Sequence, residues 1–229
     1  MTVAGELGHP RLHFRVTDST NARARELATR GAPHGTVVTA AEQSAGRGRH
    51  GRTWSAPAGR ALLCSVVLRD PPPLLPLVAG VAVAERVGPE ARIKWPNDVL
   101  VAGLKVAGIL VEARLQEGWA VVGIGVNVAV ARESLSPEVR ERAGTLGLEP
   151  SAIEPWLGAL LGSLEVWLGT GSELVLDAVR SRDALLGQEV RWAGGAGVGA
   201  GIDGDGRLVV RTEGGAVALD AGEVHLGGG

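Results

Sequence analysis

Cysteine is nearly absent from this chain of 229 residues: Cys64 is the single one, so no internal disulfide can hold the fold together. Tyrosine is missing and phenylalanine occurs once. The formal net charge is only −2, whereas domains that coat nucleic acid are usually strongly basic. No uninterrupted apolar run is long enough to span a bilayer, and the N-terminus lacks the charged-then-apolar pattern of a signal peptide. We therefore expect a cytoplasmic protein.

Apolar residues are plentiful, at 45% of the chain, which is enough to bury a sizeable core. The length allows one large domain, or a main domain with a small appendage. The composition changes at Gly187, where short alternating segments separated by glycine-rich turns begin. We therefore place a boundary near residue 184 and predict a main domain over 1–183 and a compact antiparallel barrel over 184–229.

Hydrophobic periodicity predicts the elements of both parts. In the main domain the predicted strands are 12–16, 36–41, 61–69, 99–102, 104–112 and 120–130, and Cys64 is expected to be a small buried hydrophobe. The predicted helices are 22–29, 74–87, one starting at 153, and 174–186. In the barrel the predicted strands are 189–192, 207–212, 216–219 and 223–226.

Glycine and arginine alternate in the stretch E-Q-S-A-G-R-G-R-H-G-R-T-W-S at 42–55. Glycine lets the backbone come close to a ligand, and arginine presents a rigid fork of donors for phosphate or carboxylate. The stretch is neither a P-loop nor a dinucleotide-binding turn, because it lacks G-x-x-x-x-G-K-[ST] and the G-x-G-x-x-G context. By itself it fits either a loop that closes over an anion or a solvated basic turn.

Three other polar features also have two readings each. The segment T-D-S-T-N at 17–21 fits a plain helix N-cap, or a helix start that binds a polar ligand. Lys105 interrupts an apolar strand, and it either faces solvent or points inward toward an anionic partner. Asn127, in a strand where asparagine is uncommon, is either a strand-end residue or a reader of a purine edge.

The order of the motifs is more specific than any one of them. They are D-S-T-N at 18–21, E-Q-S-A-G-R-G-R-H-G-R-T-W at 42–54, K-W-P-N-D at 94–98, K-V-A-G-I-L at 105–110 and G-I-G-V-N at 123–127. In this combination the chain closely resembles the biotin protein ligases, also called biotin–[acetyl-CoA-carboxylase] ligases, over essentially its whole length. Bifunctional bacterial members carry a winged helix-turn-helix domain before D-S-T-N. Only 17 residues precede Asp18 here, so the resemblance implies the monofunctional type without that DNA-binding domain.

The resemblance implies a mixed α/β (α+β) catalytic domain, related to class II aminoacyl-tRNA synthetases and lipoate ligases, followed by an SH3-like β-barrel. It also implies a two-step reaction in which biotin and ATP, with magnesium, first give biotinyl-5′-AMP. Biotin then passes to one lysine of a biotin carboxyl carrier protein or domain of a biotin-dependent carboxylase. No metal ligand is assigned to the protein itself. We expect a monomer or weak homodimer that binds neither DNA nor membrane.

The same resemblance assigns roles to individual residues. Lys105, Arg47 and Arg49 are the expected catalytic residues, with Lys105 bridging the biotin carboxylate and the α-phosphate. The expected biotin site consists of Ser19, Thr20, Asn21, Gln43, Arg47, Gly48, Arg49 and Lys105. The expected nucleotide site consists of Arg49, Arg52, Trp54, Lys94, Asn97, Asp98 and Asn127, with Trp54 packing near the adenine and Asn127 reading its edge.

Two alternatives remain open at this point. A lipoate or octanoate ligase on the related fold would also form an acyl-adenylate, although the arginine loop and the K-W-P-N-D and K-V-A-G-I-L motifs favour biotin. A nucleic-acid-binding module could use the arginine loop without catalysis, but the net charge of −2 argues against it.

Overall fold

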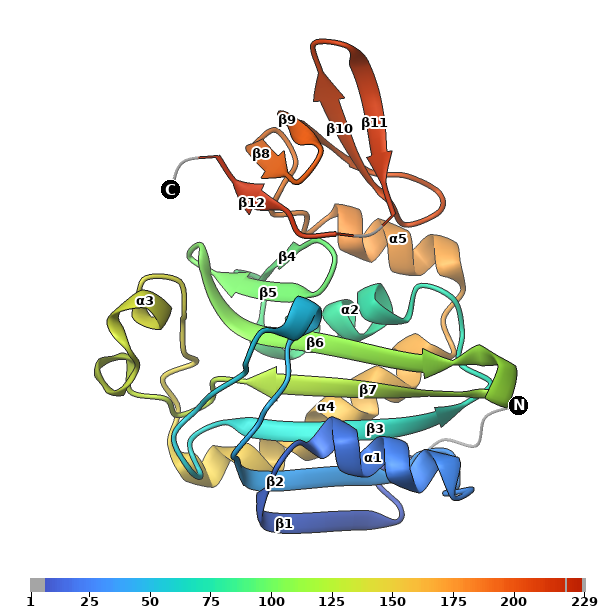
Figure 1. Ribbon diagram of the computed structural model, residues 1–229, viewed down its shortest axis with the longest axis vertical. Coiled ribbons are helices and arrows are strands. Elements are labelled where there is room, and N and C mark those ends of the chain that lie inside the picture. Colours follow the sequence, from blue (N-terminus) through green and yellow to red (C-terminus); the bar gives the residue numbers. More distant parts are fainter. Residues whose placement is uncertain (1–6, 221, 228–229) are drawn as a thin grey trace.

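A seven-stranded mixed sheet forms the centre of the computed structural model, which describes residues 7–220 and 222–227 (Figure 1). The strand order is β1-β2-β3-β7-β6-β5-β4; β1 runs parallel to β2, and the other neighbours are antiparallel. The strands are β1 (Arg11–Thr17), β2 (Val37–Gln43), β3 (Leu62–Arg69), β4 (Arg92–Lys94), β5 (Asp98–Val101), β6 (Leu104–Arg114) and β7 (Trp119–Val126). The expected mixed α/β architecture is confirmed.

Helices cover the two faces of this sheet. α1 (Thr20–Thr29) packs on one face against β3 and β7, while α2 (Leu75–Val87) and α4 (Ile153–Leu168) pack together on the other (Figure 1). Residues of β7 alternate between the faces, as a strand requires. Val122 and Ile124 join the core on the α2 side, and Val121 packs beneath α1. The two main helices predicted from periodicity are therefore confirmed.

The helix predicted over 174–186 ends earlier than expected. α5 spans Ser172–Arg180, and the chain then leaves the helix to pair with the edge strand β4. Ile93 N donates to Arg182 O at 2.7 Å, and Ala184 N donates to Ile93 O at 2.9 Å. Leu185 is fully buried. Backbone pairing with an otherwise open sheet edge outweighs local helix propensity here.

The C-terminal part forms a second, five-stranded antiparallel sheet, in the order β11-β10-β9-β8-β12, at the top of Figure 1. Its strands are β8 (Glu189–Trp192), β9 (Gly195–Ile202), β10 (Leu208–Thr212), β11 (Gly215–Leu219) and β12 (His225–Leu226). The predicted SH3-like barrel corresponds to this sheet, whose outer strands β11 and β12 do not pair with each other in the described residues. The boundary at 184 and the domains 1–183 and 184–229 remain a prediction.

Strand β9 was not predicted, because alternate residues in G-A-G-V-G-A-G-I are glycine and give no hydrophobic alternation. Close packing explains at least one of these glycines. A Cβ at Gly199 would lie 2.0 Å from Leu185 O, so any larger residue would push the sheet away from the chain before it.

Within the described residues, the connections contain short helical turns. These are η1 (Arg49–Gly51), η2 (Leu115–Glu117), η3 (Arg132–Ser134), α3 (Pro137–Arg140) and η4 (Pro150–Ala152). Across residues 7–220 and 222–227, none of the helices has the length and apolarity needed to cross a lipid bilayer.

Candidate active site

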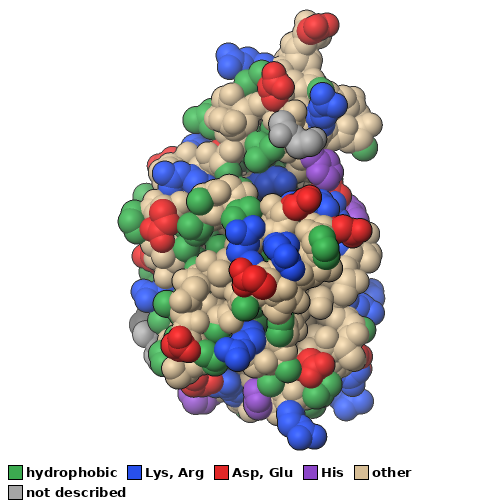
Figure 2. Space-filling model, turned by 90° about the vertical axis from the view of Figure 1, so that its left-hand side faces the viewer, with side chains coloured by type: hydrophobic (Ala, Val, Ile, Leu, Met, Phe, Trp, Pro, Cys, Tyr) green, Lys and Arg blue, Asp and Glu red, His purple; other side chains and the backbone are tan. Residues whose placement is uncertain are grey.

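An open cavity lies on the α1 side of the large sheet. It collects nearly all of the residues that the motifs single out, although they are spread over 87 positions of the sequence, from 19 to 105. Those that line it are Ser19, Thr20, Asn21, Gln43, Arg47, Gly48, Arg49, Arg52, Trp54, Lys94, Asn97, Asp98 and Lys105. In Figure 2 the molecule narrows toward the C-terminal sheet, and a basic side chain is set back in the hollow where the parts meet.

Two glycines of β7 form the floor of the cavity. A Cβ at Gly123 would lie 2.0 Å from Asn21 Oδ1, and a Cβ at Gly125 would lie 2.5 Å from the ring of Trp54. The G-I-G segment therefore places backbone where side chains on the α1 face would otherwise fill the site. The Nε1 atom of Trp54 is buried with no hydrogen-bond partner among the described residues. A buried donor without a partner is costly, so this edge of the cavity suits a ligand that accepts a hydrogen bond.

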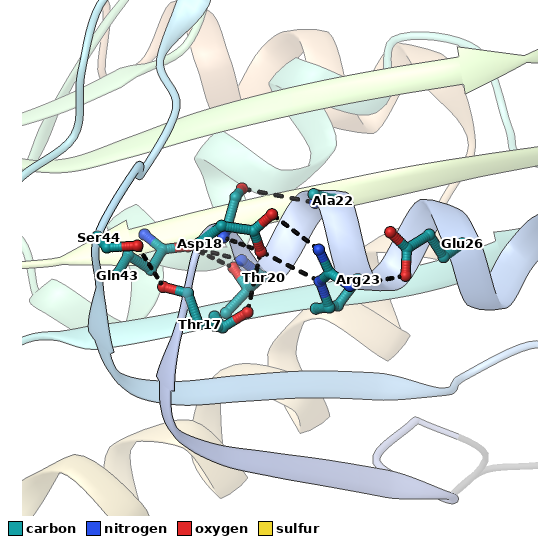
Figure 3. Close-up of polar contacts among 9 residues, drawn as sticks. Thr17, Asp18, Thr20, Ala22, Arg23, Glu26, Gln43 and Ser44 are labelled. Carbon is teal, nitrogen blue, oxygen red and sulfur yellow. Dashed lines mark hydrogen bonds and ion pairs between the residues drawn. The ribbon is translucent and has the colours of Figure 1, made fainter.

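The D-S-T-N segment caps α1 (Figure 3). Its residues Ser19, Thr20 and Asn21 also line the cavity. Ser19 is the N-cap residue, with extended backbone angles of φ −156° and ψ 131°, and its side chain accepts from Ala22 N. Asp18 accepts from Ser19 N at 2.7 Å and from Arg23 Nη2 at 2.7 Å. The hydrogen bonds from Arg23 hold the pKa of the Asp18 carboxyl well below its usual range. Asp18 thus shapes the turn, so the N-cap reading of the segment is confirmed. Thr20 and Asn21 face the cavity, and ligand binding by this helix start stays a prediction.

A chain of four side chains runs along the back of the cavity. Gln43 Oε1 lies 3.0 Å from Thr20 Oγ1, which lies 2.8 Å from Ser65 Oγ, which lies 2.6 Å from Asn21 Oδ1. Gln43 Oε1 also accepts from Thr20 N at 2.7 Å. The two ends are amide oxygens, which only accept, and each hydroxyl carries one hydrogen. Three contacts therefore share two hydrogens, and the oxygens of the contact without a hydrogen keep acceptor positions to which a ligand N–H can donate.

The arginine loop is folded over the cavity. Arg47 and Thr53 form an antiparallel bridge, and the turn η1 lies between them. Arg49 donates from Nη1 to Asn97 Oδ1 at 3.0 Å and from Nη2 to Gly222 O at 3.0 Å. Burial lowers the pKa of the Arg49 guanidinium. The loop is thus held between the β4–β5 turn and the C-terminal segment.

A cluster of charges lies at the end of the cavity near β5 and β6. Lys105 Nζ is 2.6 Å from Asp98 Oδ1 and 5.5 Å from the centre of the Trp54 ring. The Lys105 side chain therefore points into the site, as the functional reading requires. Burial lowers the pKa of Lys94. The negative charge of Asp98 partly offsets this effect, whereas the positive charge of Lys105 lowers the pKa further. Several cations with fewer anions make this end attractive to phosphate or carboxylate.

Asn127 is the one predicted site residue that the structure does not bring to the cavity. β7 ends at Val126, and Asn127 follows it with its side chain buried. Its Nδ2 donates to Gly144 O at 2.8 Å, and its own carbonyl accepts from Leu146 N at 2.8 Å. In this arrangement Asn127 holds the segment around residue 145 against the end of β7 through these hydrogen bonds. Its role in recognising the adenine edge stays a prediction.

Sequence reasoning missed several residues that belong to the site. Ser65, in the middle of β3, is fully buried, and a polar residue in a continuous apolar run is the signal that could have found it. Gly222, Glu223 and Val224 line the cavity from the C-terminal segment. An ion pair joins Glu223 to Arg52. These three residues lie far from the motifs in the sequence, so no local pattern points to them.

Comparison with known proteins identifies the family. The model of the biotin/lipoate A/B protein ligase family matches residues 13–128, slightly more than half of the chain. A biotin–[acetyl-CoA-carboxylase] ligase of Mycobacterium tuberculosis is 38% identical over 92% of this chain and 86% of its own length. The chain belongs to the biotin/lipoate A/B protein ligase family. A ligase of the same description from Paracoccus denitrificans is also 38% identical, over 93% of this chain and 98% of its own.

The structural likeness to biotin protein ligases extends beyond the region of the family model. The biotin protein ligase of Aquifex aeolicus, solved in complex with biotin and ATP, has a TM-score of 0.78 and 28% identity, with 95% of this chain and 98% of that chain covered. The family model ends at residue 128, before the C-terminal sheet. Biotin protein ligases therefore share with this chain both the large sheet and the small one.

Proposed function

We propose that this protein is a biotin–[biotin carboxyl-carrier protein] ligase that consumes ATP. It activates biotin as biotinyl-5′-AMP and transfers the biotinyl group to a lysine of a carrier domain. The observation that carries this proposal is the pairing, in one cavity, of an acceptor-ended hydrogen-bond chain with a cluster of cations around Lys105. The relatives named above are biotin–[acetyl-CoA-carboxylase] ligases, which supports a biotin-dependent carboxylase as the source of the carrier.

The hydrogen-bond chain favours biotin over lipoate. The ureido group of biotin offers two N–H donors and one carbonyl acceptor, whereas the dithiolane ring of lipoate offers neither. The chain from Gln43 to Asn21 has one hydrogen fewer than contacts, so one of its oxygens keeps an acceptor position to which a ureido N–H can donate. Gln43 Nε2 has no recorded partner within the described part of the chain and can donate to the ureido carbonyl. An apolar dithiolane would leave these polar groups unsatisfied, and that is costly in a buried site.

The first step joins two anions, and the cations of the cavity make this possible. A biotin carboxylate oxygen attacks the α-phosphorus of ATP, the bond to the bridging oxygen breaks, and pyrophosphate leaves. Lys105 neutralises the approaching carboxylate and phosphate, and Arg47, Arg49 and Arg52 supply further positive charge from the loop. Stabilisation of this kind acts through position and charge rather than through a covalent enzyme intermediate.

Magnesium would accompany the nucleotide. Mg²⁺ is usually held by one or two carboxylates together with substrate phosphates, and Asp98 is a carboxylate among the cavity residues. When bound, the ion would neutralise phosphate charge. Within the described residues no group of three or more His, Cys, Asp or Glu side chains gathers to hold a metal without the nucleotide.

The second step transfers the acyl group. The ε-amine of the carrier lysine attacks the acyl carbon of biotinyl-5′-AMP, AMP leaves with the bond electrons, and the amine gives up a proton. The arginine loop lines the cavity in which we place the adenylate. By keeping water away from the mixed anhydride, a closed loop would favour aminolysis over hydrolysis.

The remaining expectations are part of the proposal. Residues 1–183 would form the catalytic domain and residues 184–229 the small barrel-like domain. The need for ATP supports action in the cytoplasm. The net charge of −2 supports the absence of DNA binding, and we propose a monomer or weak homodimer.

Calorimetric titration with biotin and with lipoate tests the proposal. We expect biotin to bind and lipoate to bind much more weakly or not at all. Pyrophosphate release should then require ATP, magnesium and biotin together. Equal binding of both acids, or pyrophosphate release driven by lipoate or octanoate, would reject biotin as the substrate. A gel shift with a salt titration checks the nucleic-acid alternative, for which we expect no salt-dependent complex.

A further inference from the structure

Glu112 does not line the large cavity but a second open pocket beside the arginine loop, and it contacts two side chains of α1 at once. One carboxylate oxygen accepts from Arg25 Nη1 at 2.7 Å, and the other accepts from Asn21 Nδ2 at 2.9 Å. Glu112 is part of β6, whereas Asn21 and Arg25 lie one turn apart on α1. The side chain of Glu112 is 24% exposed, so this contact is largely shielded from solvent.

The contact with Glu112 fixes which way the Asn21 amide faces. An amide presents an NH₂ group on one side and an oxygen on the other. Leu110 O, at 3.2 Å, and Glu112 are both acceptors, so the NH₂ group of Asn21 must face them. The oxygen of Asn21 then faces Ser65 Oγ at 2.6 Å, and the Ser65 hydroxyl must donate to it.

The orientation of the Asn21 amide determines which groups donate in the rest of the hydrogen-bond chain. Because Ser65 uses its single hydrogen on Asn21, it cannot donate to Thr20, and Thr20 must supply any hydrogen that they share. Gln43 Oε1 is an acceptor whatever Thr20 does, because it receives Thr20 N–H. The chain is short of one hydrogen only while Asn21 keeps its oxygen toward Ser65.

We propose that Glu112 is a positioning residue that sets the donor and acceptor pattern read by the ligand. This inference rests on the proposed function, since it takes the ligand to be biotin with its ureido N–H groups. A carboxylate suits the task because it has two acceptor oxygens, one for each neighbour. A glutamine would have only one, so either Arg25 or Asn21 would meet an NH₂ group.

Glu112→Gln is the first variant that tests the proposal. Arg25 is always charged, so the glutamine oxygen should face it and turn its own NH₂ group toward Asn21 Nδ2. Two donors in contact oppose this orientation of Asn21 and leave only the 3.2 Å hydrogen bond to Leu110 O to hold it, so the acceptor at the end of the chain is no longer fixed toward Ser65. We expect biotin to bind about tenfold more weakly by calorimetry. The KM for ATP in pyrophosphate release should stay within about twofold of the wild-type value.

Arg25→Met and the double variant separate this role from a structural one. Arg25→Met removes the ion pair but leaves Glu112 with Asn21, so biotin affinity should stay within about twofold of wild type. In Glu112→Gln/Arg25→Met the glutamine oxygen is released to accept from Asn21, and most of the lost affinity should return. If Glu112 acted instead through its charge or its packing, the double variant would bind biotin as weakly as Glu112→Gln or more weakly.

The outcomes distinguish this inference from the proposed function. Failure of the wild-type protein to bind biotin would reject the proposed function. Tight binding of biotin by both wild type and Glu112→Gln would reject only the role of Glu112. Weak binding by Glu112→Gln without recovery in the double variant would also reject it.

Discussion

Lys105 shows how a single residue can be interpreted before its surroundings are known. A lysine in an apolar strand is costly to bury without a partner, so an inward orientation implied an anion. The structure supplies Asp98 at 2.6 Å and leaves the ammonium in the cavity. Cys64 is the simpler case, since it is 1% exposed as expected, and burial raises the pKa of its thiol to about 12. The thiol therefore stays neutral at physiological pH.

Replacing Lys105 tests the proposed bridge between carboxylate and α-phosphate. We expect Lys105→Ala to lower the rate of adenylate formation by about a hundredfold or more, because it removes a cation positioned at the developing charge. The variant should stay folded by circular dichroism. Arg114→Ala, an exposed cation on the same strand, is the control and should keep its activity. Unchanged pyrophosphate release by Lys105→Ala would remove Lys105 from the mechanism.

Asp18 gives a prediction about pH. Its pKa is lower in the folded protein than in the unfolded chain, mainly because of Arg23. Its contribution to stability is therefore full above the unfolded pKa of about 3.9 and is lost as the pH falls toward the folded value. Asp18→Asn should lower the Tm by about 2–4 °C at neutral pH. The difference from wild type should shrink as the pH approaches about 3.

Thermal unfolding of both proteins over this pH range measures the effect. Asp177→Asn is the matched control, because Asp177 pairs with Arg180 within one turn of helix but is 67% exposed. Its Tm should differ little from wild type at every pH. A Tm difference for Asp18→Asn that stays constant with pH would show that the charge of Asp18 is not involved.

At the scale of elements, prediction succeeded where the pattern was strong and local. The apolar periods of α2 and α4 and the continuous run of β3 gave elements that the structure has. It failed at β9, where glycine hides the alternation, and after Arg180, where pairing with β4 ends the helix. Both failures come from packing between segments that lie apart in the sequence, and a local sequence pattern contains no information about such packing. The arginine loop was placed correctly, but its anchors on Asn97 and Gly222 were not foreseen.

Those anchors sharpen a prediction for the loop. Arg49→Gly removes both hydrogen bonds and adds flexibility, since each residue that must be ordered costs roughly 1–2 kcal/mol of backbone entropy. Biotinyl-5′-AMP should still form but escape before transfer. We expect the variant to label lysines of serum albumin in proportion to their exposure, whereas wild type should label only the carrier.

His50→Gly is the control for loop flexibility alone. His50 already has a positive φ of 54°, which glycine adopts without strain. The substitution removes the 3.4 Å contact between His50 Nε2 and Arg49 Nη2 but leaves Arg49 bonded to Asn97 and Gly222. Bystander labelling should stay near the wild-type level. Equal, negligible labelling by Arg49→Gly and wild type would mean that Arg49 does not retain the intermediate.

At the scale of the whole molecule, the two sheets share one hydrophobic core. Leu77 and Leu176 belong to the same buried cluster as Leu208 of the small sheet, and Trp95 Nε1 donates to Gly206 O at 3.0 Å. The motifs predicted a pocket that lies entirely before residue 128. The structure adds residues 222–224 to it. That part of the site could not be predicted, because it depends on how the two sheets pack rather than on any motif.

The ion pair between Arg52 and Glu223 tests whether the small sheet contributes to nucleotide use. Glu223→Gln removes the charge that holds Arg52, so we expect the KM for ATP to rise by about two- to tenfold while biotin binding is unchanged. Steady-state pyrophosphate release at varied ATP measures this. Glu213→Gln, an exposed residue of the same sheet region, should behave as wild type. A rise in the biotin Kd with no change for ATP would contradict this coupling.

The most direct measurement of the central claim is the mass of a carrier domain after incubation with the protein, ATP, magnesium and biotin. We predict a gain of one biotinyl group on one lysine, identified by fragmentation, and no gain when ATP or biotin is left out. Lipoate in place of biotin should leave the carrier unchanged. An unmodified carrier in the complete reaction, or a carrier that gains a lipoyl group instead, would contradict the account.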